Sequence, residues 1–413
     1  MDVVSSCGLC KGKAFQEIFD WGMFSSGFPV EPYEASTSQV WQEKLVLEIC
    51  KRCFLVQTVH KMPHEKLGRE NLYLSECSKL ILDHYEYLSS YIPSLLSLPK
   101  DSLILEIGCG DGSLLRKFRQ KGFENVIGVE PAIHPQREYP FGIIADFFNS
   151  NVVETLKNAG KYPDCIISNS VLYQVPDLDV FFTDLSSLMK KGSFAVIEVE
   201  YFNDAVRNLR FDGFSHLRCY WFTVNSLIYA FNKYKLQIID IEHDPDYRGG
   251  ILRVIATKNK HSKENLKPHL LDWKDRELRE LSSQSLKSFG DKINQIIEVA
   301  QGKIAELIEQ KVSIYGYGGG IKAATIVNSL NLTSKEIRMV VDMDPNKHGK
   351  VIPVANIPIR PVSDLFEQEE SGKKAVIMLA LDHAVEVEKL LLEKLKKNSM
   401  IIYILPEFRV VTV

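Results

Sequence analysis

Short apolar runs alternate with amphipathic stretches through the middle of the chain, which is the pattern of parallel strands separated by helices. The first run, Leu103–Ile107, is followed by the glycine-rich stretch Gly108–Gly112 and then by the helical pattern Ser113–Arg119. Six further strands are expected at Val126–Val129, Gly142–Phe147, Asp164–Asn169, Gly192–Tyr201, Leu236–Glu242 and Gly249–Thr257. The alternation predicts a doubly wound α/β domain over residues 67–258, with a hairpin-like end.

The stretch Gly108-Cys-Gly-Asp-Gly112 indicates a nucleoside site at the end of the first strand. Glycines at alternate positions, here Gly108, Gly110 and Gly112, let the backbone turn sharply and approach a ligand. Such turns serve NAD, FAD and S-adenosylmethionine (SAM), so the turn alone leaves the ligand open. Glu106, two residues before the first glycine, would repel a pyrophosphate but suits the ammonium and sulfonium groups of SAM. The spacing also departs from the dinucleotide pattern, and we therefore predict a SAM site.

Polar residues after the next strands complete this predicted site. Glu130 ends the second strand, eighteen residues past Gly112, where its carboxylate is placed to accept hydrogen bonds from a ribose diol. Asp146 ends the third strand and is placed for the adenine amino group, with Phe147 beside it. Asn169 lies at the carboxyl end of the fourth strand, the edge at which ligands bind in such sheets.

A second unit of strand, glycine-rich turn and helix begins at Lys311 and contains Gly316-x-Gly318-x-Gly320. Its next strand ends in Asp342, and two more strands are expected at Lys374–Ala380 and Met400–Leu405. We expect a Rossmann-like unit over residues 311–413, joined to the first by a charged helical connector over 259–310. No acid precedes these glycines, so the unit suits a nucleotide-bearing substrate or a nicotinamide cofactor; a packing role is the alternative.

Four of the eight cysteines form two C-x2-C pairs, Cys7 with Cys10 and Cys50 with Cys53. In a reducing compartment this arrangement predicts a tetrahedral zinc site rather than disulfides, and four thiolates would make the metal structural. Residues 1–66 contain too few apolar residues for an independent core, so zinc would supply much of their folding energy. The isolated cysteines are expected in the core: Cys77, Cys109, Cys165 and Cys219.

Composition narrows the classes of partner. Of 413 residues, 45% are hydrophobic and 25% are charged, and the formal net charge is −3. That balance gives no attraction to nucleic acid or to an anionic membrane surface, and no apolar run has the length of a membrane helix. Met1–Cys7 lack the basic and apolar regions of a signal peptide, so we expect a cytoplasmic protein. Its partner would be a small molecule, and it would be a monomer or a small homo-oligomer.

Two segments would border the ligand cleft. Tyr73, Ser75 and Ser78 lie where the chain enters the α/β domain, although a helix cap and first turn explain them equally well. Residues 210–223 are dense in aromatic and polar groups and follow the fifth strand, where an insertion would cover the site. His216 lies in this segment and is a candidate for catalysis as well as for packing.

The order of these parts resembles the three-domain, SAM-dependent C-methyltransferases of nucleotide-linked deoxysugars, which have an N-terminal zinc domain, a class I methyltransferase core and a C-terminal Rossmann-like domain. The residues that carry the resemblance are Cys50-x-x-Cys53-x-Leu-Val-Gln57, Tyr73-x-Ser75-x-x-Ser78, Glu106-x-Gly108-Cys-Gly110-Asp-Gly112, Val129-Glu-Pro131, Gly249-Gly-x-Leu-Arg253, Tyr315-Gly-x-Gly-x-Gly-x-Lys322, Asp342-x-x-Pro345-x-Lys347-x-Gly349 and Ile357-Pro-Ile359. They are co-linear over nearly the whole chain.

The resemblance implies methylation of a carbon next to a ketone. A general base would remove the proton α to the carbonyl, neighbouring donors would stabilise the enolate, and the carbon would attack the SAM methyl group in line. The resemblance also implies that Pro131 borders the cofactor and that Ser78, Tyr315, Gly316, Lys322 and Asp342 bind the nucleotide-linked substrate.

The chain departs from the family where the base should lie. The family's Tyr-His-Glu-His cluster reads Ser215-His216-Leu217-Arg218, its histidine after the fourth strand is Gln174, and its His-Gly-Gly-Ser reads Arg248-Gly-Gly-Ile. His216 and Tyr73 remain as candidates for the base and for an oxyanion donor or second proton carrier. Arg218 and Arg248 would instead clamp an anionic substrate.

Sequence reasoning therefore favours a SAM-dependent methyltransferase acting on a sugar, and the family resemblance implies that this sugar is nucleotide-linked. Three alternatives remain: an NAD(P)-assisted sugar-modifying enzyme that uses the C-terminal unit, an O- or N-methyltransferase of a related small molecule, and a SAM-binding protein without catalysis.

Overall fold

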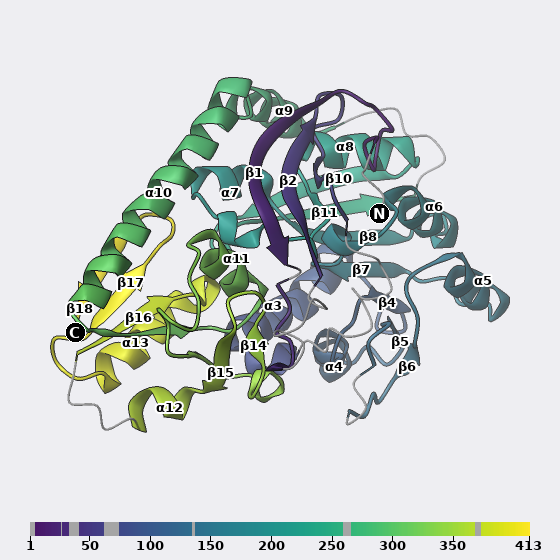
Figure 1. The fold of residues 1–413 in the computed structure, drawn as a ribbon. Helices are drawn as coiled ribbons and strands as arrows, with labels where there is room; N and C mark the ends of the chain where they lie inside the picture. The colour runs from purple at the N-terminus through teal and green to yellow at the C-terminus, as the bar shows by residue number, and fades with distance from the viewer. Residues whose placement is uncertain are drawn as a thin grey trace.

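The fold contains three sheets, which Figure 1 shows packed side by side. The structure is a computed structural model. It describes residues 5–25, 27–32, 41–61, 74–133, 137–258, 266–367 and 373–413. No helix within these ranges is both long and apolar enough to cross a bilayer.

The central sheet has seven strands and confirms the predicted doubly wound α/β domain. Its spatial order is β10 (Gln237–Asp244), β11 (Ile251–Thr257), β8 (Phe194–Glu200), β7 (Cys165–Asn169), β4 (Ile104–Ile107), β5 (Val126–Val129) and β6 (Gly142–Ile144). Only β11 runs antiparallel to its neighbours. Strands β4, β5 and most of β7 and β8 are buried on both faces, which explains their continuous apolar runs.

Helices cover both faces of this sheet, as expected for a doubly wound fold. They are α3 (Lys79–Leu96), α4 (Ser113–Gln120), α5 (Ser150–Asn158), α6 (Leu178–Leu188) and α8 (Val224–Lys233). Shorter elements at the carboxyl edge of the sheet are η1 (Ser75–Cys77), η2 (Leu172–Gln174), α7 (Phe202–Arg207) and η3 (Phe211–Gly213).

The C-terminal sheet also has seven strands and is mostly parallel. Its order is β14 (Val351–Ile352), β15 (Ile357–Pro361), β13 (Val340–Asp342), β12 (Ser313–Tyr317), β16 (Lys374–Met378), β17 (Met400–Tyr403) and β18 (Arg409–Thr412), with the two outermost strands antiparallel. Its helical elements are α11 (Ile321–Ser329), η4 (Pro345–Lys347), α12 (Val362–Glu367), η5 (Leu381–His383) and α13 (Ala384–Lys394).

The third sheet joins distant parts of the chain. Its strands are β1 (Phe15–Ser25), β2 (Gln42–Cys50), β3 (Val56–Thr58) and β9 (Tyr220–Trp221). β9 belongs to the segment that we expected to cover the ligand site, and it pairs with β3 through Val56–Trp221 and Gln57–Tyr220. The sheet that carries the paired cysteines is therefore not confined to residues 1–66.

Two helices, α9 (Pro268–Glu280) and α10 (Ser283–Glu309), form the expected connector, and α10 runs along one side of the molecule from β1 to the C-terminal sheet (Figure 1). The connector is not only a solvated face. Glu277 of α9 is fully buried and accepts hydrogen bonds from the backbone N–H groups of Val224 and Asn225, at 2.8 and 2.9 Å. These bonds satisfy the first N–H groups of α8.

Phe214 packs where the three sheets meet. It is fully buried, and its ring lies 5.5 Å from that of Trp21 in β1, 4.9 Å from Trp221 in β9 and 6.2 Å from Phe289 in α10. Its carbonyl oxygen accepts a hydrogen bond from the hydroxyl of Thr325 in α11, at 3.1 Å. One hydrophobic core thus continues from the N-terminal sheet through α10 into the C-terminal unit.

Replacing Phe214 with alanine tests this continuity. Removal of a buried ring that contacts several elements should lower the free energy of unfolding by about 3–5 kcal/mol, and the N-terminal and C-terminal units should still unfold together. Denaturant unfolding followed by both circular dichroism and tryptophan fluorescence measures both effects. Val385→Ala, at a side chain that is 85% exposed, is the control and should change stability by less than about 0.5 kcal/mol. A Phe214→Ala protein as stable as the control would contradict this account of the core.

Candidate functional site

A cavity of about 460 Å³ opens at the carboxyl edge of the central sheet. This volume lies in the range of roughly 300–1,000 Å³ that is usual for small-molecule sites. Among the residues that line it are Ser75, Tyr85, Gly108, Gly110, Asp111, Glu130, Pro131, Phe147, Asn169, Val171, Tyr173, Gln174, Arg218, Arg248 and Ile321. Most of the SAM-binding residues predicted from the sequence therefore border one cavity.

The glycine-rich turn after β4 requires glycine for two reasons. Gly108, Gly110 and Gly112 have φ values of 72°, 52° and 75°, in the left-handed region that favours glycine. A Cβ atom at Gly108 would overlap the Val171 side chain, and one at Gly112 would lie 2.6 Å from Phe141. The turn is therefore tightly enclosed by its neighbours, and only glycine fits there.

Glu130 follows β5 and is hydrogen-bonded to the glycine-rich turn. Its two carboxylate oxygens accept hydrogen bonds from the backbone N–H groups of Gly110 and Ala132, both at 2.8 Å. Burial raises the pKa of Glu130, whereas these two bonds lower it. Each oxygen keeps a second lone pair, so the carboxylate can still accept from a ligand hydroxyl group.

Glu106 lies beneath the turn and is not among the cavity-lining residues. It is buried, one of its oxygens has no hydrogen-bonding partner in the described part of the chain, and burial together with Asp111 and Glu130 raises its pKa well above the usual range. Asp111, which sequence reasoning missed, does line the cavity. Its oxygens accept from the N–H groups of Ser113 and Glu76, at 3.1 and 3.2 Å. Acidic groups around the turn favour a cationic ligand over a pyrophosphate.

Asn169, at the end of β7, presents a polar group to the cavity. Its side-chain nitrogen is buried and has no hydrogen-bonding partner among the described residues, which leaves a donor available for a ligand. Phe147 lines the cavity, but Asp146 does not. The oxygens of Asp146 accept instead from the N–H of Phe147 at 2.8 Å and from the Asn149 amide at 3.3 Å.

The strand order divides the cavity into two halves. Glu130 and Phe147 follow β5 and β6 on one side of β4, whereas Asn169 and Tyr173 follow β7 on the other. Beyond β7 lies β8, whose last residue, Glu200, forms an ion pair with Arg218. We call the β5–β6 side the donor half and the β7–β8 side the acceptor half.

Arg218 and Arg248 form the wall of the acceptor half. Burial alone would raise the pKa of Glu200, but Arg218, Lys322 and Arg248 lower it to about 2, so the carboxylate stays ionised. Arg248 begins a run of three left-handed residues, with φ values of 54°, 89° and 108° through Gly249 and Gly250. A Cβ atom at Gly250 would overlap the Asp204 carboxylate. This Gly-Gly pair therefore lets the loop before β11 fold closely and place Arg248 at the cavity.

Lys322 of α11 lies behind this wall in a network of ion pairs. Its ammonium group lies 2.8 Å from Asp382, which also contacts Arg210 at 2.6 Å. Lys322 and Arg248 line a second, very small cavity of about 20 Å³ together with Glu200. The C-terminal unit thus closes the acceptor half through Ile321 and Lys322.

The other residues predicted to bind the substrate through the C-terminal unit lie elsewhere. Tyr315 is fully buried in β12, and a Cβ atom at Gly316 would lie 2.8 Å from Val340, so both contribute to packing. Asp342 accepts from the N–H of Gly319 at 2.6 Å, and the Lys347 ammonium group lies 3.1 Å from it.

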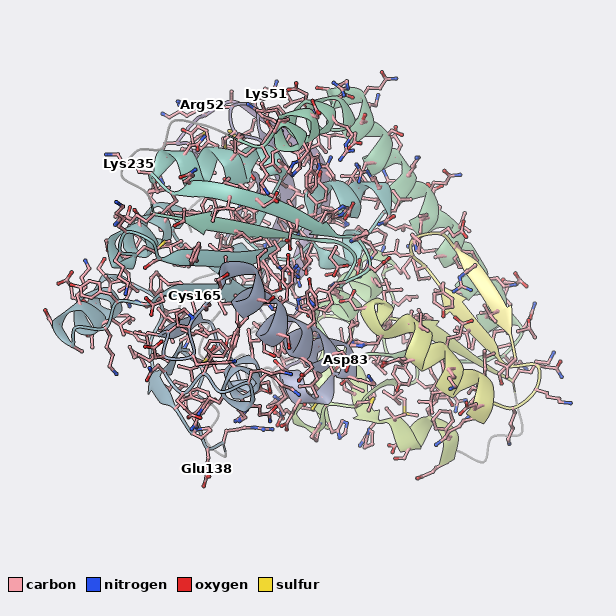
Figure 2. All side chains as sticks on the ribbon, turned by 180° about the vertical axis from the view of Figure 1, so that it is seen from behind. Lys51, Arg52, Asp83, Glu138, Cys165 and Lys235 are labelled. Atoms are coloured by element: carbon pink, nitrogen blue, oxygen red, sulfur yellow. The ribbon has the colours of Figure 1, made fainter. Side chains whose placement is uncertain are left out.

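Asp342 borders a separate cavity of about 680 Å³ between α3 and the C-terminal unit, where Figure 2 shows Asp83. Ser78 also lines this cavity, and its hydroxyl caps α3 by accepting from the N–H of Ile81 at 3.3 Å. The acidic lining residues outnumber the basic ones: Glu76, Asp83, Glu86, Asp342, Asp344 and Glu386 against Lys79, Lys117, Lys347 and His383. Tyr317 and Gly318 of the second glycine-rich turn also line this cavity, and its acidic lining disfavours the phosphates of a dinucleotide.

The structure contradicts the prediction that His216 is the catalytic base. Its ring is fully buried, and its two nitrogens lie 3.2 and 3.0 Å from the carbonyl oxygens of His60 and Glu43. It does not line the cavity, and Trp41 packs edge-on against it at 4.7 Å. His216 therefore joins two segments of the chain. Tyr73, the other catalytic candidate, lies outside the described residues.

The two C-x2-C pairs come together as one buried cluster. The sulfur atoms of Cys7, Cys10, Cys50 and Cys53 all lie within 4.8 Å of one another. Each pair is followed by a left-handed residue, Lys11 or Phe54, whose N–H bonds back to the first cysteine's carbonyl oxygen at 3.0 Å. The two turns therefore have the same geometry.

Backbone N–H groups also point at this cluster. Those of Gly12 and Arg52 lie 3.3 and 3.4 Å from the sulfurs of Cys10 and Cys50. Hydrogen bonds from the thiols of Cys53 and Cys7 lower the pKa of Cys50, which favours a thiolate. Lys51 and Arg52, between Cys50 and Cys53, are exposed at the edge of the molecule (Figure 2).

Comparison with known proteins agrees with this geometry. A family model described as a methyltransferase domain matches residues 79–241, and one described as a C-methyltransferase C-terminal domain matches residues 246–406. C-methyltransferase NovU of Streptomyces niveus is 24% identical over 376 residues, which cover 88% of this chain and 86% of NovU. Peramine synthetase ppzA of Metarhizium majus is 26% identical over 184 residues, which cover 40% of this chain and 6% of the synthetase.

Two solved methyltransferase structures match part of this chain. The magnesium protoporphyrin IX methyltransferase of Synechocystis PCC 6803 with bound SAM is 14% identical, with a TM-score of 0.31, over 44% of this chain and 80% of its own. A SAM-dependent methyltransferase of Mesorhizobium loti is 14% identical, with a TM-score of 0.31, over 42% of this chain and 100% of its own.

The strand order, the single antiparallel strand and the glycine-rich turn at the end of β4 define a class I SAM-dependent methyltransferase. The match to NovU and the match of the C-terminal unit show that the chain is similar to C-methyltransferases over most of its length.

Gly108→Ala should weaken SAM binding. Gly160 is the matched control, because its φ of 68° is also left-handed but nothing lies within 4 Å of an added Cβ atom. Both substitutions introduce comparable backbone strain of about 1 kcal/mol or more, whereas only Gly108→Ala forces the turn against Val171. Calorimetric titration should show at least a tenfold loss of SAM affinity for Gly108→Ala and an unchanged affinity for Gly160→Ala. Equal affinities would show that the turn does not hold the ligand.

Proposed function

We propose that this enzyme methylates a carbon next to the ketone of a sugar, and that the sugar is linked to a nucleotide. The observation that carries the proposal is the two-part cavity. Its donor half has acidic groups around a glycine-rich turn, and its acceptor half ends at Arg218 and Arg248. The match to a C-methyltransferase over most of the chain supports carbon as the accepting atom.

Several residues of the donor half fit SAM. We propose that Glu130 accepts hydrogen bonds from the ribose, that Phe147 and Pro131 contact the adenine, and that the free amide N–H of Asn169 donates to the ligand. Asp146 would reach the adenine amino group only from the cavity edge. Glu106 would support the turn from beneath without contacting the ligand, because it does not line the cavity. When bound, SAM supplies an electrophilic methyl group.

The residues of the acceptor half fit an anionic substrate. Two guanidinium groups at one wall can hold a diphosphate or the negative charge of an enolate, because arginine stays charged and presents several donors. Lys322 adds a third positive charge behind the wall. Val171 and Ile321 contribute apolar surface to the cavity.

Incubation with SAM carrying a 13C-methyl group tests the proposed reaction. The acceptors would be the thymidine and uridine diphosphate esters of 4-keto-6-deoxyglucose, with the corresponding 4-hydroxy sugars as controls. We expect a product heavier by one labelled methyl group only from a keto sugar, with a 13C chemical shift typical of a methyl group bonded to carbon. A shift typical of a methoxy group would assign the enzyme to O-methylation, and the absence of any product would contradict the keto-sugar proposal.

We also propose that the cysteine cluster binds one structural zinc ion. The Zn–S distance of about 2.3 Å requires tetrahedral sulfurs about 3.8 Å apart, and the sulfurs of Cys7 and Cys53 already lie 3.5 Å apart. Elemental analysis should find one zinc per chain, and Cys10→Ser should lose it and lower the thermal midpoint. Cys77→Ser is the control, because Cys77 is exposed and lies outside the cluster. A wild-type protein without zinc and insensitive to chelators would contradict this proposal.

A further inference from the structure

Tyr173 borders the acceptor half of the cavity. It lies in η2, four residues after the end of β7, and lines the cavity together with Gln174. The backbone turns into η2 through Ser170, whose φ is 55°. No hydrogen bond joins the Tyr173 hydroxyl to another residue in the ranges that the structure describes. The hydroxyl is therefore free to bond to a ligand.

Arg218 lies against the same tyrosine. Its guanidinium carbon is 4.4 Å from the centre of the Tyr173 ring, which is the geometry of a cation–π contact. Burial alone would lower the pKa of Arg218, but Glu200 and Tyr173 raise it, so the guanidinium group stays charged. The guanidinium group of Arg218 also forms an ion pair with the carboxylate of Glu200.

A backbone hydrogen bond joins the segments that carry these two side chains. The N–H of Cys219, directly after Arg218, donates to the carbonyl oxygen of Tyr173 at 2.6 Å. Cys219 is followed by β9, which is itself paired to β3. The arrangement of Tyr173 and Arg218 is thus set by main-chain bonds and does not depend on the phenol hydroxyl.

From this geometry we propose that Tyr173 and Arg218 form an oxyanion site, in which the phenol O–H and the guanidinium N–H groups together bind the ketone oxygen of the acceptor. This inference rests on the proposed function, because it names the groups that stabilise the acceptor in that reaction. Tyr173 is then a catalytic residue, because its hydroxyl group would contact the reacting ketone oxygen.

The charge balance of the step explains why two donors are needed. The C–H bond next to the ketone breaks, its electron pair forms the enolate, and the ketone oxygen gains a negative charge while the proton passes to solvent water. The enolate carbon then forms the new C–C bond, and the electron pair of the S–C bond stays on sulfur. Donors that are already oriented toward that oxygen lower the barrier, because negative charge develops there before the methyl group is transferred.

Two substitutions separate this role from a structural one. Tyr173→Phe removes only the hydroxyl, which has no partner among the described residues, and Arg218→Lys keeps the charge but changes the donor geometry. The substrate is the keto sugar that accepts a methyl group in the assay described above. We expect kcat to fall at least thirtyfold for Tyr173→Phe, while SAM affinity changes less than twofold. Tyr162→Phe, at a tyrosine that is 41% exposed, is the matched control and should leave kcat unchanged. An unchanged kcat in Tyr173→Phe would overturn the proposal.

A binding measurement tests the site without turnover. Oxalate is a planar oxyanion that mimics an enolate, and with S-adenosylhomocysteine present it should bind the wild-type protein and the Tyr162→Phe control. Calorimetric titration should show at least a tenfold weaker affinity for both Tyr173→Phe and Arg218→Lys. Absence of oxalate binding to the wild-type protein, or equal affinities in the variants, would overturn the oxyanion site. If oxalate binds as expected but no keto sugar is methylated, the proposed function fails while the oxyanion site stands.

Discussion

The burial of residues 211–222 between the three sheets is the constraint on which the rest of the structure depends. Every residue of this stretch is buried. Phe214 inserts into the core shared with α10 and the C-terminal unit, whereas Trp221 completes the N-terminal sheet. Between these two anchors Arg218 lines the cavity and forms an ion pair with Glu200. The packing of three units around one short stretch therefore sets the position of the acceptor wall, and it explains why an enzyme of this kind needs more than its SAM-binding sheet.

Features encoded by local patterns could be predicted from the sequence. The strands of the central sheet are continuous apolar runs, the glycines before α4 need left-handed backbone, and the cysteine spacing brings four sulfurs together. Features that depend on distant residues could not. A two-residue strand such as β9 has no pattern of its own, and the buried state of His216 comes from carbonyl groups more than 150 residues away in the chain. Asp111 was visible within the glycine-rich turn, but only the three-dimensional arrangement shows that it lines the cavity.

The two glycine-rich turns show how similar sequences serve different purposes. The first is enclosed by side chains yet borders a cavity, and carboxylates surround it. In the second, a Cβ atom at Gly318 would lie 2.7 Å from Ala380, and Lys347 neutralises the acid at the end of β13. The second turn directs α11 toward the first domain, so that Ile321 reaches the cavity. Close packing explains the glycine at position 318, which also lines the cavity beside α3.

The division of the cavity along β4 has a consequence for how such enzymes diversify. The donor half is built from the loops after β4, β5 and β6, whereas the acceptor half is built from η2, the stretch that carries Arg218 and the loop that carries Arg248. These two sets of residues are encoded by separate parts of the gene. Mutations can therefore accumulate in the acceptor loops and select a new methyl acceptor while the ancestral donor chemistry is inherited intact.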